Sequence, residues 1–236
     1  MSIPGPPEVI ACPACGAKHF RETLISGNTC GSRYYSDGRM VAPFLPAFPY
    51  FVRCCACKAF FKITEEVISE RLQEDSYFRG KSRCDFPFVE FLTIDEFCQA
   101  IQDGLHNSRP KGSKEYDNDI WSLRIQLWHT FNDKVRDDKG GAGAIEDPRY
   151  IDNCRTMLSE IREEDRVRDE EEEGPDRDTS LLMLAEIHRN LGEFEECMRL
   201  LGEIANADKY SRYIPLISEQ CAAQNRKTVR INPSEA

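Results

Sequence analysis

The spacing of apolar side chains divides the chain into a front part without helical periodicity and a longer back part with it. Residues 9–63 hold short apolar runs among Cys, Gly, Pro and aromatic residues, a pattern typical of short strands and turns. From residue 64 onward, apolar side chains recur three and four positions apart, which indicates amphipathic helices. The pattern predicts an α+β fold, with a small β-rich domain at the front and a helical domain behind it.

Local composition marks six segments along this outline. Pro and Gly crowd the start of the chain, and charged residues crowd the stretch around residue 170, so neither stretch is expected to pack into a domain. The expected segments are a flexible lead at 1–8, a β-rich domain at 9–63, a helical middle region at 64–161, an acidic linker at 162–178, a second helical region at 179–225 and a flexible tail at 226–236.

Start and stop signals place individual elements within these segments. Asp37-Gly38 between β-prone residues predicts a two-residue hairpin loop. Thr93 and Glu96 form a capping-box sequence ahead of a helix that is expected to end near Gly104. Further helices are predicted from Thr64 through Val67, Ile68 and Leu72 to about Gly80, from about Asp119 to 136, and from about Pro148 to Ile161.

The clearest chemical signal is a pair of C-x2-C motifs. The chain has 11 cysteines, an odd number, so intrachain disulfides cannot pair them all. Four of them form the two motifs, namely Cys12 with Cys15 and Cys54 with Cys57. Both thiolates of such a motif can point at one ion, and two motifs can close a tetrahedral four-cysteine site. The sequence therefore predicts a bound Zn²⁺.

This predicted zinc ion is structural, because four thiolates leave no open position at which a water could react. The gap between the two motifs is longer than in a compact ribbon, and an inserted hairpin at Asp37-Gly38 accounts for the excess. His19 and Cys30 are alternative ligands that could replace one member of the set.

Overall composition narrows the class of protein. With 31 Lys+Arg against 41 Asp+Glu, the 236 residues carry a formal net charge of −10, which argues against binding to nucleic acid or to anionic lipid. No stretch approaches the ~20 apolar residues of a membrane-spanning helix. The start of the chain lacks the pattern of a secretory signal, so we expect a cytoplasmic protein, in which paired cysteines more often bind metal than form disulfides.

Catalytic machinery is not evident in the sequence. The four histidines fall on different expected elements, and no nucleophile elbow, phosphate-binding loop or dinucleotide fingerprint is present. One helix carries a candidate binding cleft for an anion or a peptide, formed by residues four apart: Arg124, Trp128, Asn132 and Arg136. The alternative interpretation is that Trp128 is buried in a core with polar neighbours beside it.

Residues 181–204 read as two antiparallel helices that meet at Gly192, and they resemble a tetratricopeptide unit. The positions that carry the resemblance are Leu181, Leu184, Ala185, His188, Gly192, Phe194, Cys197, Leu201 and Ile204. Only one such pair is present, whereas a solenoid needs about three repeats to bury its faces. We therefore expect this tetratricopeptide-like region to pack on the other helices.

The order of these features is similar to that of uncharacterised bacterial zinc-ribbon proteins, in which two C-x2-C turns precede a helical region with a single tetratricopeptide-like pair. The resemblance implies a zinc ribbon at residues 9–63 and a helical domain behind it, and it implies no reaction. We expect a non-enzymatic zinc-binding adaptor or scaffold for a protein partner, with no membrane association. The alternatives are a nucleic-acid-associated zinc-ribbon factor and an enzyme with its cleft near Trp128.

Overall fold

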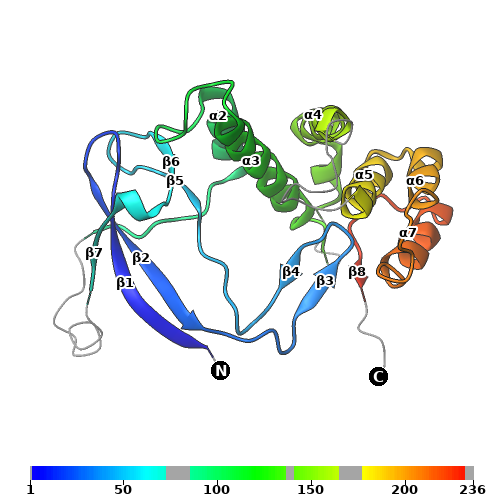
Figure 1. Cartoon of the computed structure of the whole chain (residues 1–236), viewed down its shortest axis with the longest axis horizontal. Coiled ribbons are helices and arrows are strands. Elements are labelled where there is room, and N and C mark those ends of the chain that lie inside the picture. The colour runs from blue at the N-terminus through cyan, green and yellow to red at the C-terminus, as the bar shows by residue number, and fades with distance from the viewer. Residues whose placement is uncertain (1, 73–85, 137–140, 165–176, 232–236) are drawn as a thin grey trace. The chain divides into compact units, whose positions relative to one another are not determined.

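The structure is a computed structural model, which describes residues 2–72, 86–136, 141–164 and 177–231. Its internal contacts divide the chain into two compact units, of which the first comprises residues 1–32 and 41–126 and the second comprises residues 33–40 and 127–236. Strands dominate the first unit and helices the second (Figure 1), so the predicted α+β class is confirmed.

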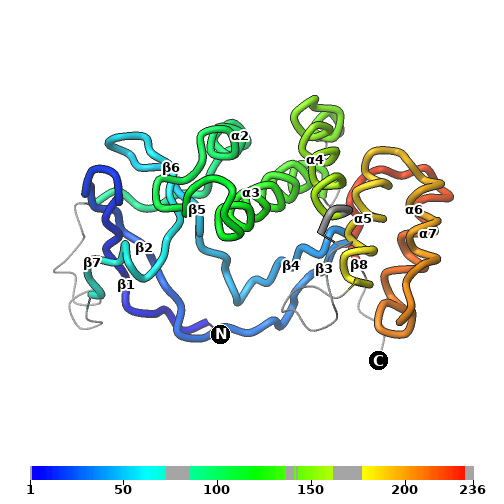
Figure 2. The backbone as a smooth tube through the Cα atoms, turned by 45° about the horizontal axis from the view of Figure 1, so that its top comes forward, coloured from blue at the N-terminus to red at the C-terminus, as the bar shows by residue number. Residues whose placement is uncertain are grey.

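The first unit is built on a three-stranded antiparallel sheet. Strand β1 (Ile3–Ala11) lies at its centre, between β2 (Lys18–Ser26) and β7 (Ile68–Arg71). Figure 2 shows β1 and β2 running side by side. A second sheet pairs β5 (Phe51–Arg53) with β6 (Phe60–Lys62).

Side chains from both sheets meet in one core. Its buried members are Ile10, Cys12, Val52, Cys54, Phe61, Ile63 and Val67. Two of these seven are cysteines of the C-x2-C motifs, so two of the four candidate metal ligands belong to the same cluster that holds the two sheets together.

The start of the chain differs from the predicted flexible lead at 1–8, because β1 already begins at Ile3. Its prolines are tolerated because β7 pairs only with Glu8, Val9 and Ile10 and leaves the earlier part of β1 with one neighbour. The register between β1 and β2 is also irregular near Pro4 and between Gly5 and Glu8, where fewer backbone donors are needed.

The predicted helix from Thr64 to about Gly80 is wrong in its described part. Residues Glu65–Val67 form a single 3-10 turn, for which the Thr64 side chain provides no cap, and Ile68–Arg71 continues as strand β7. Residues 68–71 form a strand rather than a helix because they pair with the edge of β1. This pairing satisfies their backbone N–H and C=O groups, whereas an isolated short helix is only marginally stable in water. The remainder of this prediction, residues 73–80, lies outside the described residues.

Helix α2 (Ile94–Asp103) confirms the predicted capping box. The backbone N–H of Glu96 donates to Thr93 Oγ1 at 3.3 Å, and the backbone N–H of Thr93 donates to Glu96 Oε2 at 3.0 Å. The helix ends at Gly104, whose φ of +80° is readily adopted by glycine.

Helix α3 (Lys114–Asn132) begins earlier than predicted and also ends earlier. The expected cap, Asp119, is instead a buried residue inside the helix, where it accepts hydrogen bonds from Lys62 Nζ at 2.8 Å and Ser108 Oγ at 2.5 Å. These two partners are more than ten residues away in sequence, which is why helix signals alone misplace the start.

The second unit contains the remaining helices together with a small sheet. Helix α4 (Pro148–Glu164) starts where predicted, and α5 (Arg177–Leu191), α6 (Phe194–Leu201) and α7 (Tyr213–Ala222) follow it. Figure 2 shows α5, α6 and α7 packed side by side. The predicted turn at Gly192 between α5 and α6 is confirmed by its φ of +83°. Most of the predicted acidic linker, residues 165–176, lies outside the described residues.

The hairpin predicted at Asp37-Gly38 is present, but its loop is longer by one residue. Strand β3 (Arg33–Tyr35) pairs with β4 (Met40–Val41), and the Tyr35 N–H donates to the Arg39 carbonyl at 3.0 Å. Gly38 has a φ of +76° and donates its N–H to the Tyr35 carbonyl at 2.9 Å. This is a three-residue loop with a left-handed glycine rather than a two-residue one.

The predicted flexible tail at 226–236 is also different in its described part. Strand β8 (Arg230–Ile231) pairs with β3, and the segment ahead of it is held by helix α5. The Asn190 side chain donates to the Arg226 carbonyl at 2.8 Å, and the Arg226 guanidinium donates back to the Asn190 carbonyl at 2.9 Å. These contacts with distant residues of α5 hold the start of the segment, and they have no signal in the local sequence.

A buried ion pair on α5 organises this part of the second unit. Glu186 and Arg189 are 0 % exposed, and Arg189 donates to Glu186 Oε2 at 2.8 Å. Arg189 also donates to the carbonyls of Asn225 and Lys227, and Ser36 Oγ donates to Glu186 Oε1 at 2.6 Å. The pair therefore joins the hairpin loop, helix α5 and the C-terminal segment.

A second buried pair holds the same loop. The Arg136 guanidinium donates to both carboxylate oxygens of Asp37, and Asn132 Nδ2 donates to Asp37 Oδ2 at 2.9 Å. Burial acts to raise the pKa of Asp37, but the hydrogen bonds from Arg136 and Asn132 and the charges of His129 and Arg136 together lower that pKa below its usual value. His129 Nε2 lies 3.1 Å from the Asp37 carbonyl oxygen.

We expect the Arg189→Met substitution to destabilise the chain by about 3–5 kcal/mol, because it leaves the buried Glu186 carboxylate without a counter-ion. Chemical denaturation followed by circular dichroism measures the change. The matched control is Arg199→Met on α6, which removes an exposed ion pair with Glu196 and should change stability far less. Equal losses in the two variants would contradict the organising role of the buried pair.

We also expect acidification from pH 7 to pH 5 to destabilise the second unit through His129. Burial lowers the pKa of His129, with Arg39 and Arg136 adding to the effect against Asp37, so the unfolded chain binds a proton that the folded chain refuses. This stabilisation is complete above the unfolded pKa of about 6.5 and is lost as pH falls toward the folded pKa.

The measurement is the free energy of unfolding at pH 7 and at pH 5. His129→Gln keeps a donor for the Asp37 carbonyl and should reduce the loss on acidification, by at most about 1.4 kcal/mol per pH unit for one proton. His106→Gln removes an exposed histidine and serves as the control. An unchanged pH dependence in His129→Gln would contradict the assignment.

Candidate metal centre

The two C-x2-C motifs form turns of the same geometry. One turn joins β1 to β2 and the other joins β5 to β6. In each, the N–H of the first cysteine donates to the carbonyl five residues on: Cys12 to Ala17 and Cys54 to Ala59, both at 2.9 Å. Each hairpin therefore presents its cysteines in the same way.

The residue after each motif closes the turn with a left-handed backbone. Gly16 has a φ of +74° and donates its N–H to the Cys12 carbonyl at 2.8 Å. Lys58 has a φ of +67° and donates to the Cys54 carbonyl at 3.1 Å. A positive φ is uncommon for lysine, and the side chain is held by a hydrogen bond from its Nζ to the Cys55 carbonyl at 2.7 Å.

The turns bring four sulfur atoms together. The Cys12 and Cys57 Sγ atoms lie 3.7 Å apart, as do those of Cys15 and Cys54, and all four lie within 4.8 Å of one another. A tetrahedral zinc ion with Zn–S bonds of ~2.3 Å requires sulfur atoms ~3.8 Å apart. The spacing of these sulfurs therefore fits a zinc ion, and the predicted clustering of the four cysteines is confirmed.

Burial is divided evenly between the turns. Cys12 and Cys54, the first cysteine of each motif, are 2 % and 0 % exposed and belong to the core of the unit. Cys15 and Cys57 are exposed. A bound ion would thus lie where the core reaches the surface, and it would cross-link the two hairpins.

The thiol pKa values show how much charge the protein itself can stabilise at the centre. Burial raises the pKa of Cys12 to about 12. Burial acts in the same direction on Cys54, but hydrogen bonds from the Cys57 backbone and from His19 outweigh it and lower that pKa to about 6. Protein groups therefore favour the thiolate of Cys54, and a divalent cation would supply the charge that favours the thiolate of Cys12.

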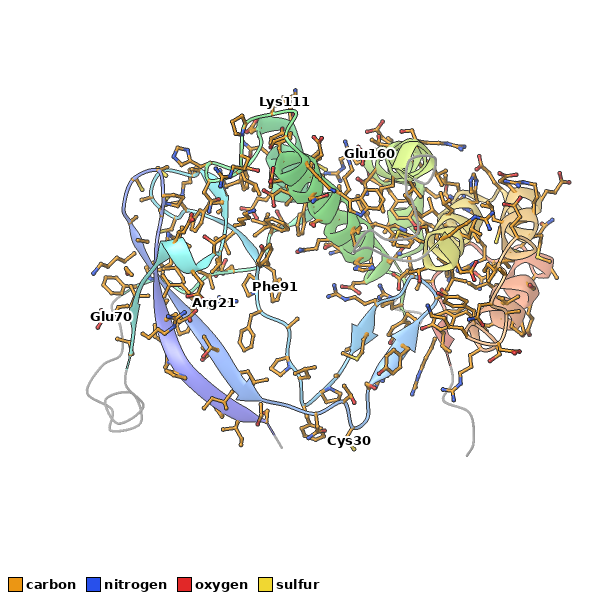
Figure 3. The ribbon with its side chains drawn as sticks, viewed as in Figure 1. Arg21, Cys30, Glu70, Phe91, Lys111 and Glu160 are labelled. Atoms are coloured by element: carbon orange, nitrogen blue, oxygen red, sulfur yellow. The ribbon has the colours of Figure 1, made fainter. Side chains whose placement is uncertain are left out.

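The two alternative ligands lie outside the sulfur cluster. His19 is 2 % exposed on β2 and interacts with Cys54 rather than taking a place among the four atoms. Figure 3 shows Cys30 beyond the far end of β2 from the first turn, and its side chain is exposed. The core interactions of His19 were not predictable from its spacing to either motif, because they depend on how β1, β2 and β5 pack.

Helix α3 carries Arg124, Trp128 and Asn132 of the candidate cleft, whereas Arg136 lies beyond the last residue of that helix. The four residues also differ in burial. Trp128, Asn132 and Arg136 are 0–2 % exposed, whereas Arg124 is half-buried. The Trp128 indole N–H donates to Asn190 Oδ1 at 3.1 Å. Asn132 and Arg136 bind Asp37, as described above, so the buried three serve as interior groups in this structure.

Comparison of the chain with protein-family models, with curated proteins and with solved structures finds no match. The bacterial zinc-ribbon and tetratricopeptide-like resemblances therefore stay predictions from the sequence. In the part of the chain that the structure describes, no helix is both long enough and apolar enough to cross a lipid bilayer.

We expect purified protein to contain about one zinc ion per chain and the Cys57→Ser variant to lose it, because three thiolates no longer close the tetrahedral site. Elemental analysis of the dialysed protein, with iron measured alongside zinc, gives the stoichiometry and the identity of the metal. Cys55→Ser is the matched control, since Cys55 is an exposed neighbour in the same turn that does not belong to the sulfur cluster.

Equal metal contents in the two variants would contradict this ligand set. Removal of zinc from the wild-type chain by a chelator should also unfold the first unit, since a structural zinc site supplies ~10–16 kcal/mol of apparent binding energy. Retention of the native circular dichroism spectrum after complete metal removal would show that the ion is not structural.

Proposed function

We propose that the first unit is a zinc ribbon and that the chain is a non-enzymatic adaptor that binds another protein. The observation that carries the proposal is the closed cluster of four sulfurs between two hairpin turns. With all four positions of a tetrahedral ion occupied by thiolates, a bound zinc would shape the surface around it without performing chemistry. The proposed role of the ribbon is therefore to present that surface.

The surface of the first unit supports a protein partner. Large apolar side chains that are 36–60 % exposed are frequent there: Ile3, Ile25, Val41, Phe44, Leu45, Tyr50, Phe88 and Phe91. Two of them, Phe88 and Phe91, line one apolar hollow, and an exposed apolar patch is typical of interaction sites. Because the chain has a net charge of −10, it would attract a partner with basic residues electrostatically.

The nucleic-acid alternative finds less support in the placement of the basic residues. Arg53, beside the second cysteine motif, pairs with Glu96 at 3.3 Å, and Arg39 pairs with Asp133 at 3.6 Å. Neutralised cations contribute little to phosphate binding, which depends on released counter-ions. The enzyme alternative is not supported either, because the Trp128 side chain is buried and does not line a surface that a substrate could reach.

The experiment that tests the adaptor proposal places a photo-cross-linking amino acid at Phe44 and, as a control, at exposed Met198 of the second unit. In cells of the protein's own host, we expect the probe at position 44 to give discrete adducts that protease digests and nuclease leaves intact. The adducts should disappear when Cys12→Ser is added, because the ribbon then loses its metal. Nuclease-sensitive adducts, or none at position 44, would contradict the proposal.

A further inference from the structure

An apolar hollow lies beside strands β1 and β2 in the first unit. Its volume is about 440 Å³, and its walls come from four separate stretches of chain: residues 2–7, residues 20–24 of β2, residues 46–49 and residues 88–91. The side chains that matter most for its character are Phe20, Leu24, Pro46, Phe48, Phe88 and Phe91. Phe88 and Phe91 are 59 % and 55 % exposed, although they are large aromatic residues.

The edge of β2 beside this hollow already accepts one added strand. The Phe20 N–H donates to the Pro87 carbonyl at 2.8 Å, and the Val89 N–H donates to the Phe20 carbonyl at 2.9 Å, which makes a parallel bridge between Phe20 and Phe88. The backbone groups of Phe20 therefore point away from β1. The bridge shows that this edge is geometrically able to pair with a further segment.

The next backbone groups on the same edge are those of Glu22. Alternate residues of a strand direct their N–H and C=O to the same side, so the Glu22 groups point outward like those of Phe20. Among the residues that the structure describes, no other segment makes a backbone hydrogen bond there. An unpaired strand edge next to an apolar hollow is the arrangement by which sheets bind extended peptides.

Charge identifies the occupant more closely. Glu22 is the charged residue among those lining the hollow, and its side chain is exposed on the same face of β2 as Phe20 and Leu24. A peptide that extends along this edge would place a side chain opposite Glu22, where a lysine or arginine is favoured. The acidic net charge of the chain acts in the same direction.

We propose that the edge of β2 at Glu22 binds an extended segment of a partner protein, with apolar or proline residues in the hollow and a basic residue opposite Glu22. This inference rests on the proposed adaptor function and names the class of segment that the adaptor recognises. The backbone of the segment pairs with Glu22, and its alternate side chains contact Phe88 and Phe91. Main-chain pairing supplies affinity, and the hollow and the carboxylate supply specificity.

The test uses the full chain loaded with zinc and an array of fluorescent nonapeptides with proline or aromatic residues at alternate positions and one central lysine. Fluorescence anisotropy should detect binding of members of the array, and replacing the lysine with glutamate in those members should weaken it at least tenfold. Glu22→Lys should reverse that preference, and Phe91→Ser should weaken binding at least tenfold. Ile25→Ser is the matched control, since Ile25 is 60 % exposed on β2 without lining the hollow.

N-methylation of the bound peptides at alternate backbone nitrogens adds a readout of strand pairing. One alternate set of methyl groups should abolish binding and the other should not, because only one set of N–H groups faces β2. Zinc content and melting temperature of each variant establish that it is folded.

The proposal is overturned if no peptide of the array binds, or if Glu22→Lys and Phe91→Ser bind like the wild-type chain. It is also overturned if Phe91→Ser abolishes self-association of the chain or binding to single-stranded oligothymidine in place of peptide binding, since the occupant is then a second copy or a nucleic acid. If no peptide of the array binds but the probe at position 44 still gives protein adducts, the binding site proposed here is wrong. The adaptor function proposed above then still stands.

Discussion

Convergence of four sulfur atoms is the constraint on which the first unit depends. One C-x2-C motif lies in the hairpin of β1 and β2 and the other in the hairpin of β5 and β6. The two motifs are separated by 38 residues of chain, yet their turns meet with sulfur–sulfur distances of 3.7 Å. The core around them is small, and two of its seven buried members are the cysteines Cys12 and Cys54. A divalent ion would therefore cross-link the two hairpins at the margin of the core that they share.

The second unit is held together by a different kind of interaction. Its buried charges occur in pairs, Glu186 with Arg189 and Asp37 with Arg136, and each pair has additional hydrogen bonds that satisfy its polar atoms. Buried pairs of this kind contribute little net stability compared with apolar replacements, but they are costly to break. Their main effect is therefore on the arrangement of this unit, where they fix the position of the loop of the β3–β4 hairpin. They contribute less to its overall stability.

Local signals in the sequence predicted the elements whose geometry is decided by near neighbours. The C-x2-C motifs gave the sulfur cluster, the Thr93 capping box gave α2, and Gly192 gave the turn between α5 and α6. Elements decided by distant partners were missed. Ile68–Arg71 is a strand because β1 has an open edge, and no pattern within those four residues indicates the pairing.

The candidate site shows the same division. The spacing of the cysteines identified the cluster, whereas the interaction of His19 with Cys54 and the hollow beside β1 and β2 depend on how distant segments lie in space. Arg136 and Asn132 illustrate the converse case. Their four-residue spacing indicated one functional helix face, but Arg136 lies beyond the end of α3, and the structure directs both side chains to the carboxylate of Asp37, which lies far earlier in the chain.

The membership of residues 33–40 in the second unit bears on the order in which the chain becomes structured as it leaves the ribosome. Both cysteine motifs have emerged once residue 57 is made, and the strands of their two sheets all lie before residue 72. Ser36, by contrast, binds Glu186, which is synthesised 150 residues later, and Val229, which follows 193 residues later. The contacts of Ser36 can therefore be completed only when nearly the whole chain has been made.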